Sequence, residues 1–219
     1  MIPINRDRLI LALTERAPQH IVEHLIIVGS VLLIATAIAL PLGVFLTRPR
    51  YKRYAPPIMA FLNAGQTIPP LAVIAIFMPI LGLGFTSALY ALILYGLLPI
   101  ARNSIAGLAG VSPDIKEAAR GMGMSASQVF FQVEFPLALP IILAGVRTSS
   151  VLTVSTATLA GLIGAGGLGR LIIAGLNMNW AEFILVGAGL GALMAILIDR
   201  LMNVLERVFG PPGPLAEDI

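Results

Sequence analysis

The chain has 219 residues, of which 58% are hydrophobic and only 11% are charged, and its mean hydropathy is +0.94. So few charges could not cover the apolar side chains of a soluble fold, which excludes a soluble enzyme, a disordered chain and a secreted disulfide-rich domain. The chain has no cysteine, and its net charge of +3 comes from basic residues that flank apolar runs, so neither cysteine chemistry nor nucleic acid binding is indicated.

Five apolar stretches predict an all-α integral membrane protein with five transmembrane helices, because one span needs about 20 apolar residues. The predicted spans cover residues 21–46, 54–81, 86–110, 136–162 and 182–205. Residues 1–20 mix apolar and charged side chains and are expected to form an N-terminal extracytoplasmic or interfacial segment with a surface helix. The transmembrane domain is then residues 21–208, and residues 209–219 form a cytoplasmic tail.

The second stretch is rich in proline and is too short for two full spans, which would need about 40 residues together. One broken or kinked span is the better interpretation. Asn63, Gln66 and Thr67 lie beside its prolines. Carbonyls freed by proline are tolerated only where protein or water receives them, so we place the translocation pathway here. The alternative is that these three side chains join helices without touching a substrate.

Basic residues at the ends of the spans predict the orientation in the membrane. They are Arg48, Arg50, Lys52, Arg53, Arg102, Lys116, Arg120, Arg200 and Arg207. If all of them face the cytoplasm, the second and third spans form one out-and-back hairpin and the fourth and fifth form another. The N-terminus is then outside and the C-terminus inside, although Arg6, Arg8 and Arg16 argue weakly against this.

Two more residues inside spans are pathway candidates. Tyr95, like Tyr90, could offer an aromatic face to a quaternary ammonium group, or it could pack in the core. Arg147 is the lone charge well inside the fourth span, where a charge is costly and marks a functional candidate. Its alternative role is an interfacial anchor that reaches the cytoplasmic surface.

The polar segment over residues 111–136 is predicted to form two short helices joined by a glycine turn at the cytoplasmic surface. Ser112 caps the first helix, and Gly121 and Gly123 end it. Ser125 with Gln128 predicts a capping box for the second helix.

Three further patterns match known motifs only formally. Gly164, Gly166, Gly167 and Gly169 fit a dinucleotide fingerprint, but an apolar span precedes them, so we expect a flexible outer turn or a re-entrant piece that closes the pathway. The run from His20 to His24 fits a zinc signature but lies at the start of a span, so we interpret it as a polar collar at the interface and predict no metal site. Neither lysine lies in a P-loop, so this chain is not expected to hydrolyse ATP or to carry catalytic residues.

The polar segment resembles the EAA motif of ABC importer permeases, EAA-x3-G-x9-I-x-L-P. The matching residues are Glu117, Ala118, Ala119, Gly123 and Pro136, with Val133 and Phe135 in place of the Ile and Leu. The resemblance implies a type I (MetI-like) permease fold in a bacterial cytoplasmic membrane, with these residues in a coupling helix that docks on an ATPase subunit. It implies ATPase subunits, a second permease subunit that is a copy or a paralogue, an extracytoplasmic substrate-binding protein and membrane lipid as partners, with no cofactor.

Further stretches, QTIPP at 66–70, GVRT at 145–148 and IGAGGLG at 163–169, are similar to permeases of osmoprotectant importers for glycine betaine, carnitine or choline. The alternatives are a permease for methionine or another amino acid, which shares the glycine-rich stretch, and a secondary carrier that needs no ATPase. An intramembrane metalloenzyme built on His20 and His24 is the remaining hypothesis.

Overall fold

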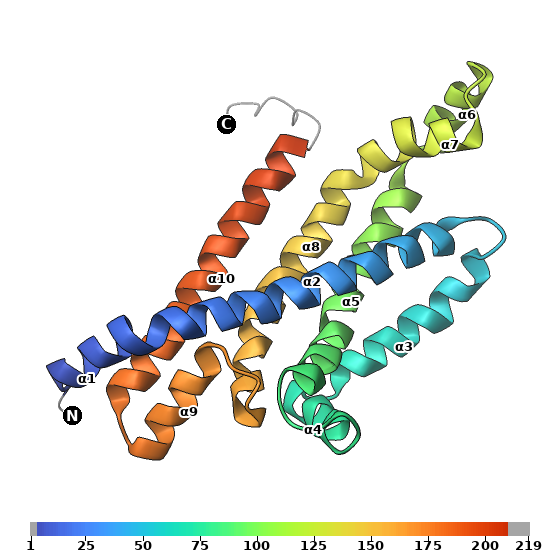
Figure 1. Cartoon of the computed structure of the whole chain (residues 1–219). Helices are drawn as coiled ribbons and strands as arrows, with labels where there is room; N and C mark the ends of the chain where they lie inside the picture. The colour runs from blue at the N-terminus through green and yellow to red at the C-terminus, as the bar shows by residue number, and fades with distance from the viewer. Residues whose placement is uncertain (1–3, 210–219) are drawn as a thin grey trace, which may run out of the picture.

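The computed structural model describes residues 4–209, and most of them are helical (Figure 1). Four uninterrupted helices are long and apolar enough to cross a membrane: Arg6–Thr47, Phe85–Gly110, Ala126–Ile163 and Ala181–Phe209. A fifth candidate is a bent pair of helices between the first two. These agree with the five predicted spans. Apart from Phe209, the predicted tail over residues 209–219 lies outside the described residues.

The helix that contains the first predicted span begins at Arg6. Helix α1 (Arg6–Ile10), a π-helical segment (Leu11–Arg16) and α2 (Ala17–Thr47) form one continuous helix. Residues 6–19 are therefore helical, and no break separates them from residues 21–46. Pro18 follows the π-helical segment, whose wider turn accommodates a residue without an N–H.

The second span is broken, as its prolines predict. After a short 3₁₀ turn (Lys52–Tyr54), α3 (Ala55–Thr67) and α4 (Pro70–Leu81) meet at an angle of 95°. Ile68 and Pro69 between them are extended, with ψ of 131° and 138°, because a residue that precedes proline avoids the helical conformation. The next helix starts after a tight turn at Gly82 and Gly84, which both have positive φ.

Helix α5 (Phe85–Gly110) is the centre of the bundle. Every residue between Ala91 and Ala101 is buried or half-buried, and α5 contacts α2, α3, α4 and the following long helix, α8 (Phe135–Ala157). A Cβ atom added to Gly145 of α8 would lie 2.8 Å from the Pro99 carbonyl oxygen, so the two helices approach closely at that point.

The polar segment has two parts. Helix α6 (Pro113–Gly121) is separate, whereas α7 (Ala126–Gln128), a π-helical segment (Val129–Glu134), α8 and a 3₁₀ segment (Thr158–Ile163) form one continuous helix. The prediction of a second, separate short helix was therefore wrong. Pro136, like Pro18, follows a π-helical segment that tolerates it, so the helix runs from the polar surface into the fourth span.

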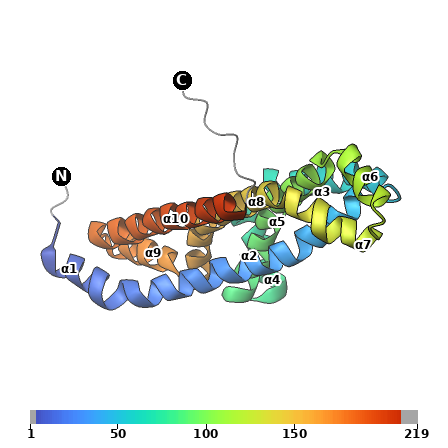
Figure 2. The same cartoon turned by 90° about the horizontal axis from the view of Figure 1, so that it is seen from above.

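Two last helices close the bundle. Helix α9 (Leu168–Met178) packs between the start of α10 (Ala181–Phe209) and the N-terminal half of α2. Seen from above (Figure 2), α2 and α10 run along opposite sides of the bundle, α8 lies beside α10, and α4 lies beyond α2. Helix α6 and the C-terminal ends of α2 and α10 lie toward one end of the molecule, and α1, α4 and α9 lie toward the other (Figure 1).

Candidate coupling surface and translocation pathway

Helix α6 is capped as the sequence predicts. The Ser112 hydroxyl accepts a hydrogen bond from the Asp114 N–H at 3.2 Å. After the helix, Gly123 takes a φ of +84°, a conformation that is strained for any residue with a Cβ. Ser125 and Gln128 form the predicted capping box, with reciprocal hydrogen bonds of 2.8 and 3.3 Å. These local bonds fix the direction in which α6 projects from the bundle.

One face of α6 is exposed and the other is packed. Ala119 is 2% exposed and lies against the bundle, whereas Glu117 and Ala118 are exposed. Two apolar side chains are also in the open: Ile115 is 46% exposed and Met122 is 77% exposed. Among residues 4–209, Glu117 forms no ion pair. Helix α6 thus presents small, apolar and acidic side chains that the rest of this chain does not cover.

A buried carboxylate fastens α6 to the long helices. Glu134 is 5% exposed, and its Oε2 accepts a hydrogen bond from Arg48 Nη1 at 2.9 Å. Its Oε1 lies 3.7 Å from Lys116 Nζ. The Arg48 guanidinium also lies over the Phe130 ring, 5.0 Å from its centroid. Glu134 therefore links α6, the end of α2 and the start of α8.

Sequence reasoning missed this role of Glu134. The signal was present, because Glu134 is the only acid in the apolar run that follows the capping box, and Arg48 and Lys116 are both predicted on the same side of the membrane. A buried carboxylate needs such partners.

The predicted pathway residues on α3 gather around the broken span. Gln66 Nε2 donates to the Tyr95 carbonyl oxygen of α5 at 2.9 Å, and the Tyr95 hydroxyl donates to the Ile68 carbonyl oxygen at the bend. Thr67 donates to its own helix, to the Ala64 carbonyl oxygen at 2.7 Å. The carbonyl freed at the bend is thus received by protein, as a membrane requires.

On the predicted pathway side, the accessible face of α3 is the one that carries Asn63 and Thr67, which are both exposed. Tyr95 is only 8% exposed, so its ring is packed in the core, whereas Tyr90 is 52% exposed. The Asn63 side chain lies against Arg102 of α5, whose Nη2 donates to Asn63 Oδ1 at 2.7 Å.

The structure does not bring Arg147 to these residues. Its guanidinium faces α10, where Nε and Nη2 donate to the two carboxylate oxygens of Asp199 at 2.6 and 3.0 Å. Nη1 donates to Glu206 Oε2 at 3.0 Å. The sequence analysis gave neither acid a role. This bidentate, doubly compensated arginine joins α8 to α10.

The glycine-rich turn is held by the residues of the formal zinc signature. Glu23 Oε2 accepts a hydrogen bond from the Gly167 N–H at 2.8 Å, and His24 Nδ1 accepts one from the Leu168 N–H at 3.3 Å. His24 Nε2 donates to the Val154 carbonyl oxygen at 3.1 Å, so both ring nitrogens are engaged.

His24 is fully buried, so the interpretation of this histidine as part of an interfacial collar was wrong. Gly164, Gly166 and Gly167 have positive φ, and a Cβ atom on Gly169 would overlap the Thr158 carbonyl oxygen. The turn is a close-packed link between α2, α8 and α9 rather than a loose loop.

Comparison with known proteins identifies the family. The model of the family described as binding-protein-dependent transport system inner membrane component matches residues 39–211. The chain belongs to this family. This member is a permease subunit of the ABC importer class, built on membrane-spanning helices.

Its relatives are similar over most of their length. The chain is 44% identical to the glycine betaine/carnitine/choline transport system permease protein OpuCB of Bacillus subtilis over 191 residues, which cover 87% of each protein. It is 42% identical to the osmoprotectant import permease protein OsmY of Salmonella typhimurium over 189 residues, which cover 86% of this chain and 80% of that protein.

A solved structure confirms the expected fold. An inward-facing structure of the MetNI methionine ABC transporter aligns with a TM-score of 0.78 at 22% identity, over 95% of this chain and 100% of that chain. The MetI-like permease fold predicted from the EAA resemblance is therefore correct, and this likeness concerns the fold alone.

Proposed function

We propose that this chain is the transmembrane subunit of an ATP-driven importer that moves osmoprotectants such as glycine betaine, carnitine or choline into the cell. The observation that carries the proposal is its identity of 39–44% to permeases whose names specify these solutes or osmoprotectants, over 86–88% of the chain. The fold likeness to a methionine transporter gives no argument about the solute, because the identity is only 22%.

The proposed partners follow from the surfaces that this chain leaves uncovered. The exposed face of α6 around Glu117 and Ala118 fits a groove on a separate ATPase subunit. A second permease subunit, a copy or a paralogue, would complete the pathway by facing the surface that α3 and α5 form. A binding protein outside the cell would deliver the solute.

The proposed orientation places α6 and the C-terminal end of α10 in the cytoplasm and the N-terminus outside the cytoplasmic membrane of a bacterium. The basic loop that follows α2, with Arg48, Arg50, Lys52 and Arg53, supports it, because basic loops favour the cytoplasmic side. It is tested by any measurement that places α6 on one side of the membrane, such as cross-linking of α6 to a cytoplasmic ATPase subunit.

In the mechanism we propose, the long helix from Ala126 to Ile163 transmits motion from α6 to the opposite side of the membrane. ATP binding would draw the two ATPase subunits together and displace α6, and Glu134 would pass that displacement to α2 and α8. The helix from Ala126 to Ile163 has 38 residues, about 57 Å at helical rise, and ends at the glycine-rich turn on the opposite side. A rigid-body tilt of this helix would switch access to the pathway from one side of the membrane to the other.

The proposal is tested by uptake into proteoliposomes that hold the assembled importer, with ATP inside. Glu117→Arg and Gly123→Ala should reduce ATP-driven uptake of glycine betaine at least tenfold while the protein still inserts and assembles. Glu117→Arg reverses a charge on the docking face, and Gly123→Ala strains the turn that aims α6.

Gly110→Ala is the matched control, because Gly110 has open space around its missing Cβ and ordinary φ. Its uptake should equal that of the wild type. Normal ATP-driven uptake in both α6 variants would refute the docking role. Uptake that persists without the ATPase but stops when the ion gradient collapses would instead support a secondary carrier.

A further inference from the structure

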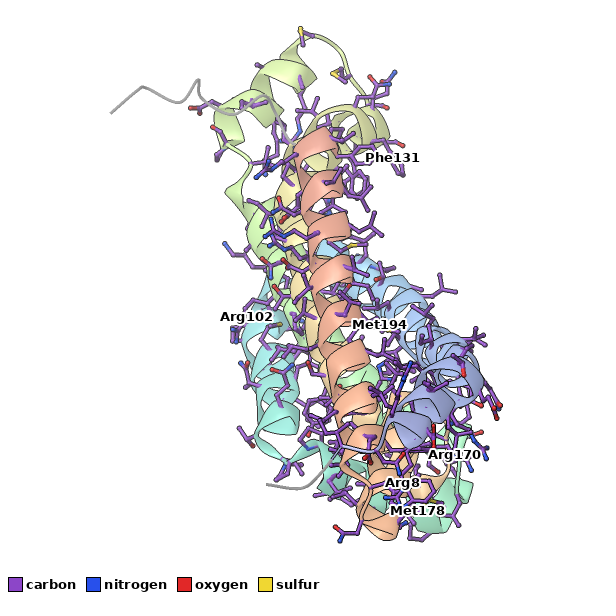
Figure 3. All side chains as sticks on the ribbon, turned by 90° about the vertical axis from the view of Figure 1, so that its left-hand side faces the viewer. Arg8, Arg102, Phe131, Arg170, Met178 and Met194 are labelled. Atoms are coloured by element: carbon purple, nitrogen blue, oxygen red, sulfur yellow. The ribbon has the colours of Figure 1, made fainter. Side chains whose placement is uncertain are left out.

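One charged side chain lies where the central helix is otherwise covered. Between Ala91 and Ile105, every residue of α5 is buried or half-buried except Arg102, which is exposed. Figure 3 shows Arg102 nearer to the coupling end, which Phe131 marks, than Arg8, Arg170 and Met178, which lie at the opposite end. Arg102 lies inside the third span, eight residues before the end of α5 at Gly110, and a guanidinium facing lipid inside a span is costly, so we infer that this part of α5 faces water or another protein surface.

Arg102 keeps its positive charge uncompensated. Its hydrogen-bond partner is the neutral side chain of Asn63, at 2.7 Å, and no carboxylate among residues 4–209 lies within 4.0 Å of it. Arg147, by contrast, is held inside the fourth span by Asp199 and Glu206. A guanidinium has five N–H donors, so Arg102 has donors left for a ligand after it binds Asn63.

We propose that Arg102, oriented by Asn63, is a carboxylate-binding point on the wall of the translocation pathway. It would bind the carboxylate of a zwitterionic solute such as glycine betaine or carnitine, in the planar geometry that guanidinium groups offer to carboxylates. Gln66 and Thr67 lie about one helical turn after Asn63 on α3, so the same helix supplies neutral polar groups near the charge. The inference rests on the proposed function and adds a specificity-determining residue to it.

The chemistry predicts selectivity between solutes. Choline carries the quaternary ammonium group without a carboxylate, so it gains nothing from Arg102. A hydrogen bond to a charged group contributes about 1.5–3 kcal/mol, which is roughly a tenfold to hundredfold effect on the zwitterion alone. One such contact in a wet pathway is weak enough to let the solute leave.

The test compares initial uptake rates of glycine betaine and choline by the complete importer in proteoliposomes, with a binding protein that accepts both. Arg102→Gln should lower glycine betaine uptake about tenfold or more and change choline uptake less than twofold. Arg102→Lys keeps the positive charge but lacks the planar guanidinium group. Its glycine betaine uptake rate should lie between those of the wild type and Arg102→Gln. Arg53→Gln, in the exposed loop that precedes α3, is the control that should leave the ratio of the two rates unchanged.

Retained choline uptake in Arg102→Gln reports that the variant is folded and assembled. Equal rates in wild type and Arg102→Gln, or an equal loss for both solutes, would overturn the inference and assign Arg102 to a lipid phosphate or to packing. A wild-type importer that moves neither solute would overturn the proposed function, and the inference with it.

Discussion

Single charges in this chain differ in how they are compensated, and that difference separates their roles. Glu134 and Arg147 each meet two opposite charges and join helices. Arg102 meets a neutral amide, and Glu117 forms no ion pair among the described residues. The paired charges of Glu134 and Arg147 stabilise the bundle. The charges of Arg102 and Glu117 are available to contact a solute or a partner protein.

Removing the Glu134 charge should destabilise the protein. Glu134→Gln leaves Arg48 and Lys116 without a carboxylate, and because these partly exposed cations are still solvated we expect a loss of about 1–2 kcal/mol of stability. We expect a lower midpoint of thermal unfolding in detergent. Glu117→Gln is the matched control, because that side chain is exposed and its loss should leave the midpoint unchanged. Equal unfolding midpoints for both variants would contradict the role of Glu134 in linking α6 to α2 and α8.

At the scale of elements, features that depend on neighbours in sequence were predictable. The cap at Ser112, the capping box at Ser125 and the break before Pro70 all rest on residues within a few positions of each other. The continuity of the helix from Ala126 to Ile163 was not predictable in this way, because a π-helical segment absorbs Pro136.

Contacts between distant residues also escaped the sequence. Glu23 and His24 hold a turn more than 140 positions away, at Gly167 and Leu168, so no local pattern reports the contact. The same holds for Asp199, whose partner Arg147 lies 52 positions earlier on another helix. The sequence located the polar residues of the site but not which of them would meet.

The glycine-rich turn provides a prediction at this scale. Gly167 has a φ of +76°, and a Cβ atom there would lie 2.9 Å from His24 Nδ1. Gly167→Ala should therefore cost about 1–2 kcal/mol of strain, disturb the link between α2 and α9 and reduce solute uptake. Gly189→Ala in α10 meets no atom within 4 Å and should behave as wild type. Thermal unfolding and uptake together measure the effect, and identical values for the two variants would argue against a structural role for the turn.

The whole molecule is a bundle with two different ends. Basic loops and α6 gather at one end, and the glycine-rich turn closes the other, with one long helix joining them (Figure 1). The family and the relatives of this chain place it among importer permeases. We propose that α6 is the point at which an ATPase subunit drives the permease.

Site-directed cross-linking tests that claim most directly, because the chain has no native cysteine. In membranes that hold the assembled importer, Ala118→Cys on the exposed face of α6 should cross-link to a cysteine in the ATPase subunit. Leu83→Cys, 73% exposed in the turn between α4 and α5 at the opposite end, should not. A permease–ATPase product that forms with Ala118→Cys alone is the predicted result. No product from Ala118→Cys, or a product from Leu83→Cys, would contradict the account.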